Sequence, residues 1–377
     1  SGGRKGRSAI DVVMLKYFTV ATMHMQRRNC AITDCDARAC YDRILPIIMY
    51  FTYHKMGLPI NECIWLARAL VNMKYQMITT YGPSENVSET TLNNPILGVG
   101  QGSTDSCAGW LLVSTRLSHM YDKSATGCTL YAPNEKINFS LTHAMFIDDA
   151  YLFHATQNYA ETPQNLQTIV QHDLLHWDQG LESTGGKLNG AKTNYTILSW
   201  KFLDNGAPYL EDTIRLSNEV HLQFNDNDET VSQISPYNHP QQFKSLEVRT
   251  PPTLQDKFEI ASMTNKCRNF AKFLVSCPLT RKEAWVAYTM YFVPSYTYSA
   301  VTLSLTTTQA TKLQRLFIPQ LFPKLGFHPT FPRSIVYAPQ HLGGLGIAPL
   351  NVIIAQRKVR FLYQHIRAQT DIGKVSS

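Results

Sequence analysis

The chain has 377 residues, 44% of them hydrophobic, and a formal net charge of +7. This length allows two or three domains with substantial cores, and the composition is that of a globular protein. The longest apolar runs, such as 44–53, fall well short of the roughly 18 residues that a membrane span requires, so we expect no membrane association. Because the sequence opens at Ser1 within a basic run and without methionine, we expect a fragment of a longer protein.

The cysteines and the distribution of charge indicate the cellular compartment of the protein and the kind of partner it binds. The eight cysteines include no C-x-x-C pair, which favours reduced thiols in an intracellular protein of the nucleus or cytoplasm. Residues 1–150 sum to +2, residues 151–250 to −6, and residues 251–377 to +11 from 15 basic and 4 acidic side chains. The last third is therefore a candidate for binding a polyanion, although solvated helix faces would explain the same bias.

The first predicted elements place polar residues at strand and helix ends. The run "CAITDCD" predicts a strand that delivers Asp36 to its C-terminal end. Residues 37–57 are predicted to form a helical or extended apolar segment closed by glycine, and residues 58–75, with a proline near their start, have helical spacing. The glycine-rich run "LGVGQGSTDS" then opens onto another predicted helix, which ends near residue 123.

The stretch "HAMFIDDAYLFHA" predicts a β-hairpin with an acidic tip. Ala144–Ile147 and Ala150–Phe153 have the composition of short buried strands, joined by a tight turn that contains Asp148 and Asp149. Two adjacent carboxylates repel each other unless a cation neutralises them. A divalent metal is the natural partner.

The rest of the chain predicts one more helix and strand, a connector and a helical domain. A helix should end at the glycines of "STGG" near 186, and "KTNYTILSW" predicts a strand. Residues 201–250 are polar and acidic, as expected of a loop-rich connector. Helical patterns follow at about 254–276, 279–300, 306–322 and 350–368, and they carry the excess of basic residues.

Single residues outside the hairpin could complete a catalytic site, but each has a structural alternative. Asp36 could supply a third carboxylate to a two-metal site, with Tyr41 against a sugar ring, or Asp36 could cap a helix while Tyr41 belongs to the core. Gln101 could bind a base edge or a sugar. Lys192 could place a cation or a proton beside a leaving pyrophosphate, or it could be an exposed loop lysine.

In combination, these motifs resemble the reverse transcriptase family, and most closely its non-LTR retrotransposon branch. The resemblance rests on Asp36 with Tyr41, "GVGQGSTDS", "FIDD" and "GGKLNGAKT", in this order over about residues 1–200. It implies an α+β fold, a right-hand polymerase palm in which an antiparallel sheet is packed by helices. The implied domains are partial fingers at 1–30, a palm at 31–200 with a finger or palm insertion at 60–97, a connector with a primer-grip-like hairpin at 201–250, and a basic, mainly helical thumb-like domain at 251–377.

The resemblance also implies roles for individual residues. Asp36, Asp148 and Asp149, with the backbone carbonyl of Ala37, would hold two Mg²⁺ ions, or Mn²⁺ in their place, and Lys192 would act as general acid. Tyr41 would exclude the ribose 2′-hydroxyl. The remaining nucleotide-binding residues would be Arg4, Lys5, Arg7, Gln101 and Gly102, and the tract 243–248 would be the primer grip. Cys107 stands where the family usually has proline.

The implied activity is RNA-directed DNA synthesis from an RNA template, a DNA primer and deoxynucleotides. Its main rival is a catalytically inactive or domesticated relative that binds nucleic acid without polymerising. An RNA-templated RNA polymerase is disfavoured by Tyr41, because such enzymes usually need a smaller gate. A zinc hydrolase would use His172 and His176 of "HDLLH", but the glutamate of the zinc-protease pattern is replaced by aspartate. The sequence does not indicate an oligomeric state.

Overall fold

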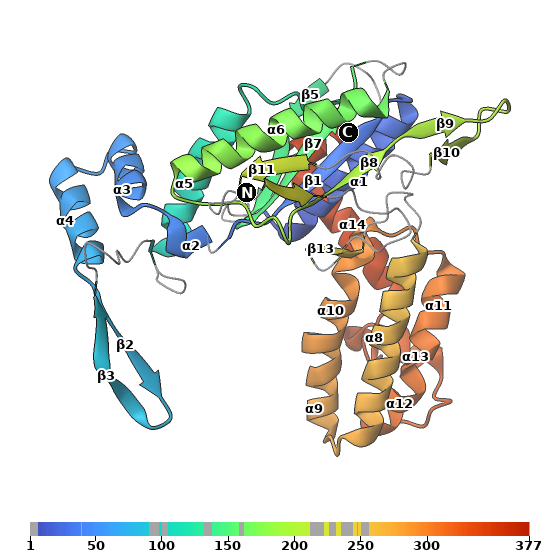
Figure 1. The fold of residues 1–377 in the computed structure, drawn as a ribbon. Coiled ribbons are helices and arrows are strands. Elements are labelled where there is room, and N and C mark those ends of the chain that lie inside the picture. The colour runs from blue at the N-terminus through green and yellow to red at the C-terminus, as the bar shows by residue number, and fades with distance from the viewer. Residues whose placement is uncertain are drawn as a thin grey trace. The chain divides into compact units, whose positions relative to one another are not determined.

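The protein is described by a computed structural model that covers residues 7–38, 40–89, 98–99, 105–131, 138–157, 162–211, 222–225, 231–234, 244–246, 248–249 and 256–376. It has an α+β fold with antiparallel sheets and a helical C-terminal region (Figure 1). The chain divides into two compact units. The sheet unit comprises Ser1–Val12, Thr22–Thr129 and Ser140–Asn238, and the helical unit comprises Val13–Ala21, Leu130–Phe139 and His239–Ser377.

Up to residue 249, the described part of the chain contains both helices and strands. The helices are α1 (Ala9–Met25), α2 (Cys40–Arg43), α3 (Pro46–Lys55), α4 (Ile60–Val71), α5 (Ser106–Tyr121) and α6 (Pro163–Ser183). The strands are β1 (Cys30–Cys35), β2 (Lys74–Thr79), β3 (Gly82–Glu89), β4 (Cys128–Tyr131), β5 (Asn138–Leu141), β6 (His143–Phe146), β7 (Asp149–Ala155), β8 (Asn194–Leu198), β9 (Trp200–Phe202), β10 (Pro208–Leu210), β11 (Leu222–Asn225), β12 (Val231–Ile234), β13 (Lys244–Ser245) and β14 (Val248–Arg249).

The main sheet has the strand order β6-β7-β1-β8, with every neighbouring pair antiparallel. The predicted strand at 30–36, the acidic hairpin and the strand after "STGG" are thus confirmed. The turn of the hairpin differs from the prediction, because Phe146 pairs with Asp149. The two-residue loop is therefore Ile147–Asp148, and Asp149 is the first residue of β7.

Helix α6 covers this sheet and contributes much of its core. It begins with a cap from the Thr162 side chain and with proline at the first helical position. Its buried apolar side chains recur every three or four residues and so form one stripe, which comprises Leu166, Val170, Leu174, Trp177 and Leu181. Helix α6 contacts β1 and β7 as well as α5. The same core cluster includes Trp110 of α5 and Leu152 of β7.

The C-terminal region is helical, as the sequence predicted. Its elements are α8 (Lys257–Ser276), α9 (Arg281–Val286), a π-helical turn (Ala287–Phe292), α10 (Val293–Thr297), a 3-10 turn (Ser299–Thr302), α11 (Thr307–Arg315), α12 (Ile318–Lys324), α13 (Arg333–Tyr337), a 3-10 turn (Gln340–Leu342), α14 (Leu350–Arg367) and α15 (Asp371–Ser376). Capping boxes at Thr280 with Glu283 and at Thr306 with Gln309 begin α9 and α11. The core of this unit is a separate cluster rich in phenylalanine and leucine.

The hydropathy of the helices and the state of the cysteines follow from the structure as well. None of the helices in the described ranges is long and apolar enough to cross a membrane. All eight cysteines are free thiols, and only Cys107 is classed as exposed.

Candidate functional site

The end of β1 and the acidic hairpin lie side by side in the main sheet. The register pairs Cys35 of β1 with Ala150 of β7. Asp36 directly follows Cys35, and Asp149 directly precedes Ala150, so their backbones leave the ladder at the same end of the sheet. Asp148 occupies the turn beside them. Three acidic residues from two distant parts of the sequence thus have their backbones at the same end of the sheet.

Electrostatic effects on a neighbouring thiol support this convergence. Burial, followed by the negative charges of Asp148, Asp42 and Asp36, raises the pKa of Cys40 to about 12, against a smaller opposing effect of a backbone hydrogen bond with Tyr41. Such effects fall off with distance, which agrees with the neighbouring backbone positions that the strand register gives these residues. Cys40 is only 4% exposed and begins α2, one turn after the end of β1.

The carboxylate of Asp36 is held by the segment after α6. The backbone of this segment runs antiparallel to 36–38: an isolated bridge joins Ala37 to Leu188, and the Asn189 amide N–H donates to the Asp36 carbonyl at 2.8 Å. The Asn189 side-chain amide also donates to Asp36 Oδ2 at 3.0 Å. Lys192 Nζ lies 3.6 Å from the same oxygen, with its side chain 69% exposed. The predicted motif "GGKLNGAK" is therefore brought to Asp36.

The start of the glycine-rich motif contacts the helix that carries Tyr41. The Val99 amide N–H donates to the Tyr41 carbonyl at 2.9 Å. Gly98 has a φ of +88°, and a Cβ there would lie 2.3 Å from the carbonyl carbon of Asp42. Only glycine fits this close approach without strain. The predicted residues Gln101 and Gly102 lie outside the described residues.

The side chain of Tyr41 is half-buried near the acidic turn. Its ring meets Trp110 edge-on at 6.4 Å between centroids. Burial raises the pKa of Tyr41 above its ordinary value, and the charges of Cys40, Cys107 and Asp148 and a hydrogen bond with Cys107 add to the rise. Tyr41 therefore stays a neutral phenol beside the carboxylates, in contact with the cysteine that replaces the family's usual proline.

Two residues that position the site, Trp110 and Asn189, are not among the predicted site residues. Trp110 Nε1 donates to the carbonyl of Ile147 at 2.6 Å, which anchors the hairpin turn to α5. Nothing in the sequence pairs a tryptophan of one helix with a turn 37 residues later. Asn189 could have been found, because it lies inside the quoted motif, three residues before Lys192.

The other predicted residues are less tied to this site. Arg4 and Lys5 lie outside the described residues, as do Phe243 and Glu247 of the predicted primer grip. Arg7 lies two residues before α1 and is half-buried, and its role toward a nucleotide stays a prediction. Within the primer-grip tract, β13 and β14 form a short hairpin.

The donor chemistry at the sheet end fits a hard divalent cation, which prefers carboxylate and carbonyl oxygens. The side chains, however, are not arranged around one point. Within the described ranges, no three His, Cys, Asp or Glu side chains are grouped closely enough to hold a metal ion. Asp36 Oδ2 instead contacts the Asn189 amide and the Lys192 amine, which would compete with a metal ion for this oxygen.

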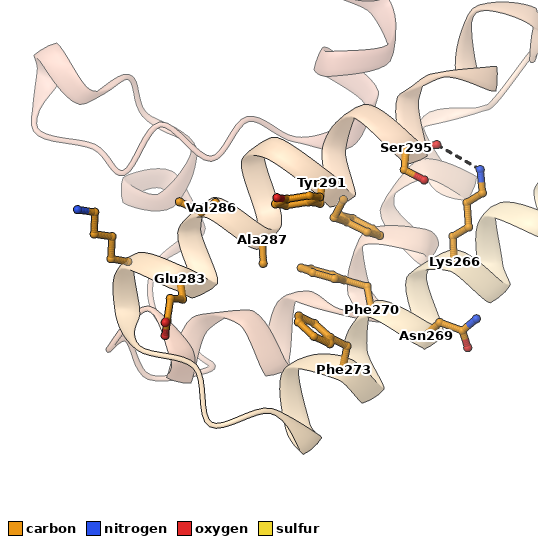
Figure 2. A pocket seen from close by; sticks show the side chains of 11 residues that line it. Lys266, Asn269, Phe270, Phe273, Glu283, Val286, Ala287, Tyr291 and Ser295 are labelled. Carbon is orange, nitrogen blue, oxygen red and sulfur yellow. Dashed lines mark hydrogen bonds between the residues drawn. The ribbon is translucent and has the colours of Figure 1, made fainter. Parts of the chain in front are cut away.

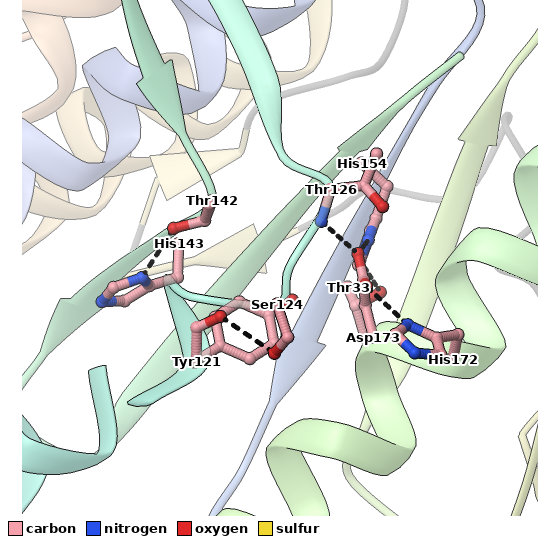
Figure 3. Close-up of polar contacts among 9 residues, drawn as sticks. All are labelled: Thr33, Tyr121, Ser124, Thr126, Thr142, His143, His154, His172 and Asp173. Atoms are coloured by element: carbon pink, nitrogen blue, oxygen red, sulfur yellow. Dashed lines mark hydrogen bonds and ion pairs between the residues drawn. The ribbon is translucent and has the colours of Figure 1, made fainter. Parts of the chain in front are cut away.

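A second polar cluster has the hydrogen-bond order of a nucleophilic triad but lies in the core (Figure 3). Thr33 Oγ1 is 3.1 Å from His154 Nε2, and His154 Nδ1 is 2.9 Å from Asp173 Oδ2. All three side chains are fully buried, so no substrate can reach the hydroxyl that a triad would use. The cluster links β1, β7 and α6 and is structural.

The two histidines of "HDLLH" have different environments. His172 Nδ1 lies 3.1 Å from Asp173 Oδ1, and the His172 side chain is 67% exposed. The His176 ring stacks on Tyr121, with centroids 6.1 Å apart. Neither belongs to a metal-binding group among the residues whose placement is described, so a zinc hydrolase has no ligand set there.

Comparisons with solved structures find several telomerases. The apo telomerase of Candida tropicalis truncated from its C-terminal domain is 14% identical, with a TM-score of 0.34 over 54% of this chain and 39% of that one. The telomerase of Candida albicans in complex with a fragment of telomeric RNA is 11% identical, with a TM-score of 0.31 over 85% and 48%. The corresponding Candida tropicalis complex is 13% identical, with a TM-score of 0.35 over 85% and 47%. The chain spans half or less of each structure's length, and similarity at this level says nothing about function.

A search of curated proteins found no match. A family model does match: the model described as reverse transcriptase (RNA-dependent DNA polymerase) covers residues 1–221. This match takes in β1, the acidic hairpin and the "GGKLNGAK" segment, which converge at one end of the sheet. The chain belongs to the reverse transcriptase family.

Proposed function

We propose that this chain is an RNA-directed DNA polymerase of the non-LTR retrotransposon type. The observation that carries the proposal is the strand register that brings the end of β1 beside the acidic turn. In this assignment residues 1–30 are partial fingers, 31–200 the palm with an insertion at 60–97, 201–250 the connector with the primer grip, and 251–377 the thumb. The substrates are an RNA template, a DNA primer and deoxynucleotides.

In the proposed site the aspartates would bind metal and Tyr41 would select the sugar. Asp36, Asp148 and Asp149 would hold two Mg²⁺ ions, with the carbonyl of Ala37 as a further ligand. Bound metal would lower the pKa of the primer hydroxyl and neutralise the triphosphate. Tyr41, kept neutral and half-buried, would restrict the space at the sugar.

Lys192 is suited to deliver a proton to the leaving pyrophosphate. Its amine lies 3.6 Å from Asp36 on an exposed side chain, so it can reach both Asp36 and solvent. A positioned general acid contributes about 10²- to 10⁴-fold to rate. In this role Lys192 would exchange its pairing with Asp36 for a contact with the phosphates of a bound nucleotide.

The direct test is primer extension on an RNA template with Mg²⁺ and deoxynucleotides. We expect Asp148→Asn and Asp149→Asn to abolish extension, because each removes an anionic metal ligand. Asp204→Asn is the matched control, since Asp204 lies in an exposed turn away from the sheet end. Equal extension by the reference chain and both site variants would refute the assignment.

Replacing Lys192 separates a catalytic from a structural role. Lys192→Met should slow extension by about 10²-fold or more, while the free energy of unfolding changes by about 1 kcal/mol at most, because exposed ion pairs contribute little. Lys201→Met is a close control: the Lys201–Glu211 pair has the same 3.6 Å separation and a half-exposed lysine. If both variants extend equally well, Lys192 is not the general acid.

The rival function is nucleic-acid binding without polymerisation. One observation favours it: the Asp36 carboxylate is paired with Lys192 and Asn189 rather than grouped with the other acids. Under this rival, the reference chain binds an RNA–DNA hybrid but extends no primer, and the Asp148→Asn variant binds it equally well.

A further inference from the structure

The helical unit contains an open groove that the proposed chemistry does not use. It lies between α8 on one side and α9, the π-helical turn and α10 on the other, and its volume is about 850 Å³. Figure 2 shows the rings of Phe270 and Phe273 on the α8 wall and the ring of Tyr291 on the facing wall. The groove is lined mainly by aromatic and aliphatic side chains, with a few polar groups among them.

Three phenylalanine rings of this groove form a stack whose outermost ring is exposed to solvent. Phe292 and Phe270 stack with centroids 4.1 Å apart and planes inclined by 11°, and Phe270 and Phe273 follow at 6.3 Å and 22°. The inner rings are buried, but Phe273 is 40% exposed and Tyr291 is 73% exposed. A flat aromatic group of a ligand could therefore continue the stack on Phe273 or lie against Tyr291.

The polar lining is suited to an anionic ligand that also has hydrogen-bonding edges. Lys282 is exposed, and Lys266 donates to the Ser295 carbonyl at 3.2 Å (Figure 2), which leaves further N–H groups of its amine. The exposed amide of Asn269 can both donate and accept. The one lining carboxylate, Glu283, is engaged by the backbone and hydroxyl of Thr280.

The charged side chains around the groove are mainly basic, like the two lysines that line it. Residues 257–311, which include both walls, carry six basic and two acidic side chains. One of the two acids is Glu283 and the other, Glu259, is fully buried. Exposed flat rings beside lysines are the combination with which proteins bind single-stranded nucleic acid, through base stacking and phosphate contacts.

We propose that this groove binds unpaired nucleotides of a single-stranded nucleic acid. One or two bases stack on Phe273 and Tyr291, Asn269 contacts a base edge, and Lys266 and Lys282 contact the phosphates. This site is separate from nucleotidyl transfer, so it can exist whether or not the chain polymerises.

The test compares two strands of equal charge. The full chain is titrated, in EDTA and without nucleotides, with a fluorescent ten-nucleotide oligoadenylate and with an abasic strand of the same length. Phe273→Ala and Tyr291→Ala should each weaken oligoadenylate binding by about 5- to 150-fold, as expected for loss of one stacked base. Neither should change abasic-strand binding, which depends on phosphates alone.

Two controls match the variants in exposure and charge. Met290 is 69% exposed beside Tyr291 but does not line the groove, and Met290→Ala should bind as the reference chain does. Lys282→Ala should weaken binding of both strands, whereas Arg268→Ala, an exposed position outside the groove lining, should weaken it less. Thermal unfolding of each variant checks that it folds.

Unchanged oligoadenylate binding by both aromatic variants would overturn the proposal and leave a protein segment as the groove's occupant. Equal loss of both strands would also overturn it, because stacking would then contribute nothing. Repeating the titration in an Asp148→Asn background separates this site from the proposed polymerase site: the effects of the groove variants should be the same there.

Discussion

The buried carboxylate of Asp173 is a position at which a single substitution should strongly destabilise the sheet unit. Its two oxygens accept from His154 at 2.9 Å, from His172 at 3.1 Å and from the Thr126 amide at 3.4 Å. Asp173→Ala leaves a buried histidine and a backbone N–H without their acceptor. Each unsatisfied buried donor costs about 1–3 kcal/mol, and breaking a buried charged pair costs about 3–5 kcal/mol. We expect a loss of about 3–5 kcal/mol.

His172→Ala is the matched control for this prediction. It removes a hydrogen bond to the same carboxylate, but the His172 side chain is 67% exposed, so water replaces it. The expected loss is below about 1 kcal/mol. Because the chain has two units, urea unfolding is best followed by hydrogen exchange of the β1 and β7 amides, which report on the sheet unit alone. Similar losses for Asp173→Ala and His172→Ala would refute the argument from burial.

The pH dependence of Asp173 gives an independent check. Burial alone would raise its pKa, but hydrogen bonds and charge from His154, with help from His172, outweigh burial and lower it. A lowered pKa means that the ionised carboxylate stabilises the fold above its ordinary pKa of about 3.9. This stability is lost as the pH falls through the lower folded-state pKa. The stability difference between the reference chain and Asp173→Asn should therefore be largest near neutral pH and shrink below about pH 4; a constant difference would contradict the assignment.

Two further variants test how the proposed site is positioned. Trp110→Phe removes the hydrogen bond to Ile147 and should lower the free energy of unfolding by about 0.5–1.5 kcal/mol. The loss should be no larger, because Ile147 is 44% exposed and water can reach the freed carbonyl. Primer extension should fall more than stability, and normal extension would exclude a positioning role. Gly98→Ala places a Cβ 2.3 Å from Asp42 and should destabilise the chain and weaken nucleotide binding, whereas Gly206→Ala, at a similar φ of +79° with nothing within 4 Å, carries the backbone strain without the clash. Equal stability losses, measured by urea unfolding, would show that the close approach does not matter.

The sequence was sufficient for elements whose pattern is local. The buried strand that ends just before Asp36, the acidic hairpin and the helix before "STGG" have apolar patterns that match their structures. The turn was misplaced by one residue, because the sequence offers two adjacent acids and no signal for which one pairs. The strand register decides: Phe146 pairs with Asp149, which leaves Asp148 in the loop.

What the sequence could not predict are contacts between segments far apart. Trp110 and Ile147 meet only because α5 packs near the hairpin, and tryptophan in a helix otherwise reads as core. His172 and His176 suggested one shared site from their spacing, yet their rings have different partners, since Asp173 between them is turned into the core. Spacing on a helix defines a face but not what the face meets.

The turn of the acidic hairpin contains a strained backbone conformation at Ile147. Ile147 has a φ of +58°, a conformation that costs an L-residue about 1–2 kcal/mol and that is unusual for a β-branched one. A two-residue hairpin turn with positive φ at its first position normally has glycine there. Two restraints hold Ile147 in place, the β6–β7 pairing and the bond from Trp110. Backbone strain that neighbouring contacts maintain is typical of functional sites, and here it lies in the residue next to Asp148, at the end of the sheet where Asp36 and Asp149 also lie.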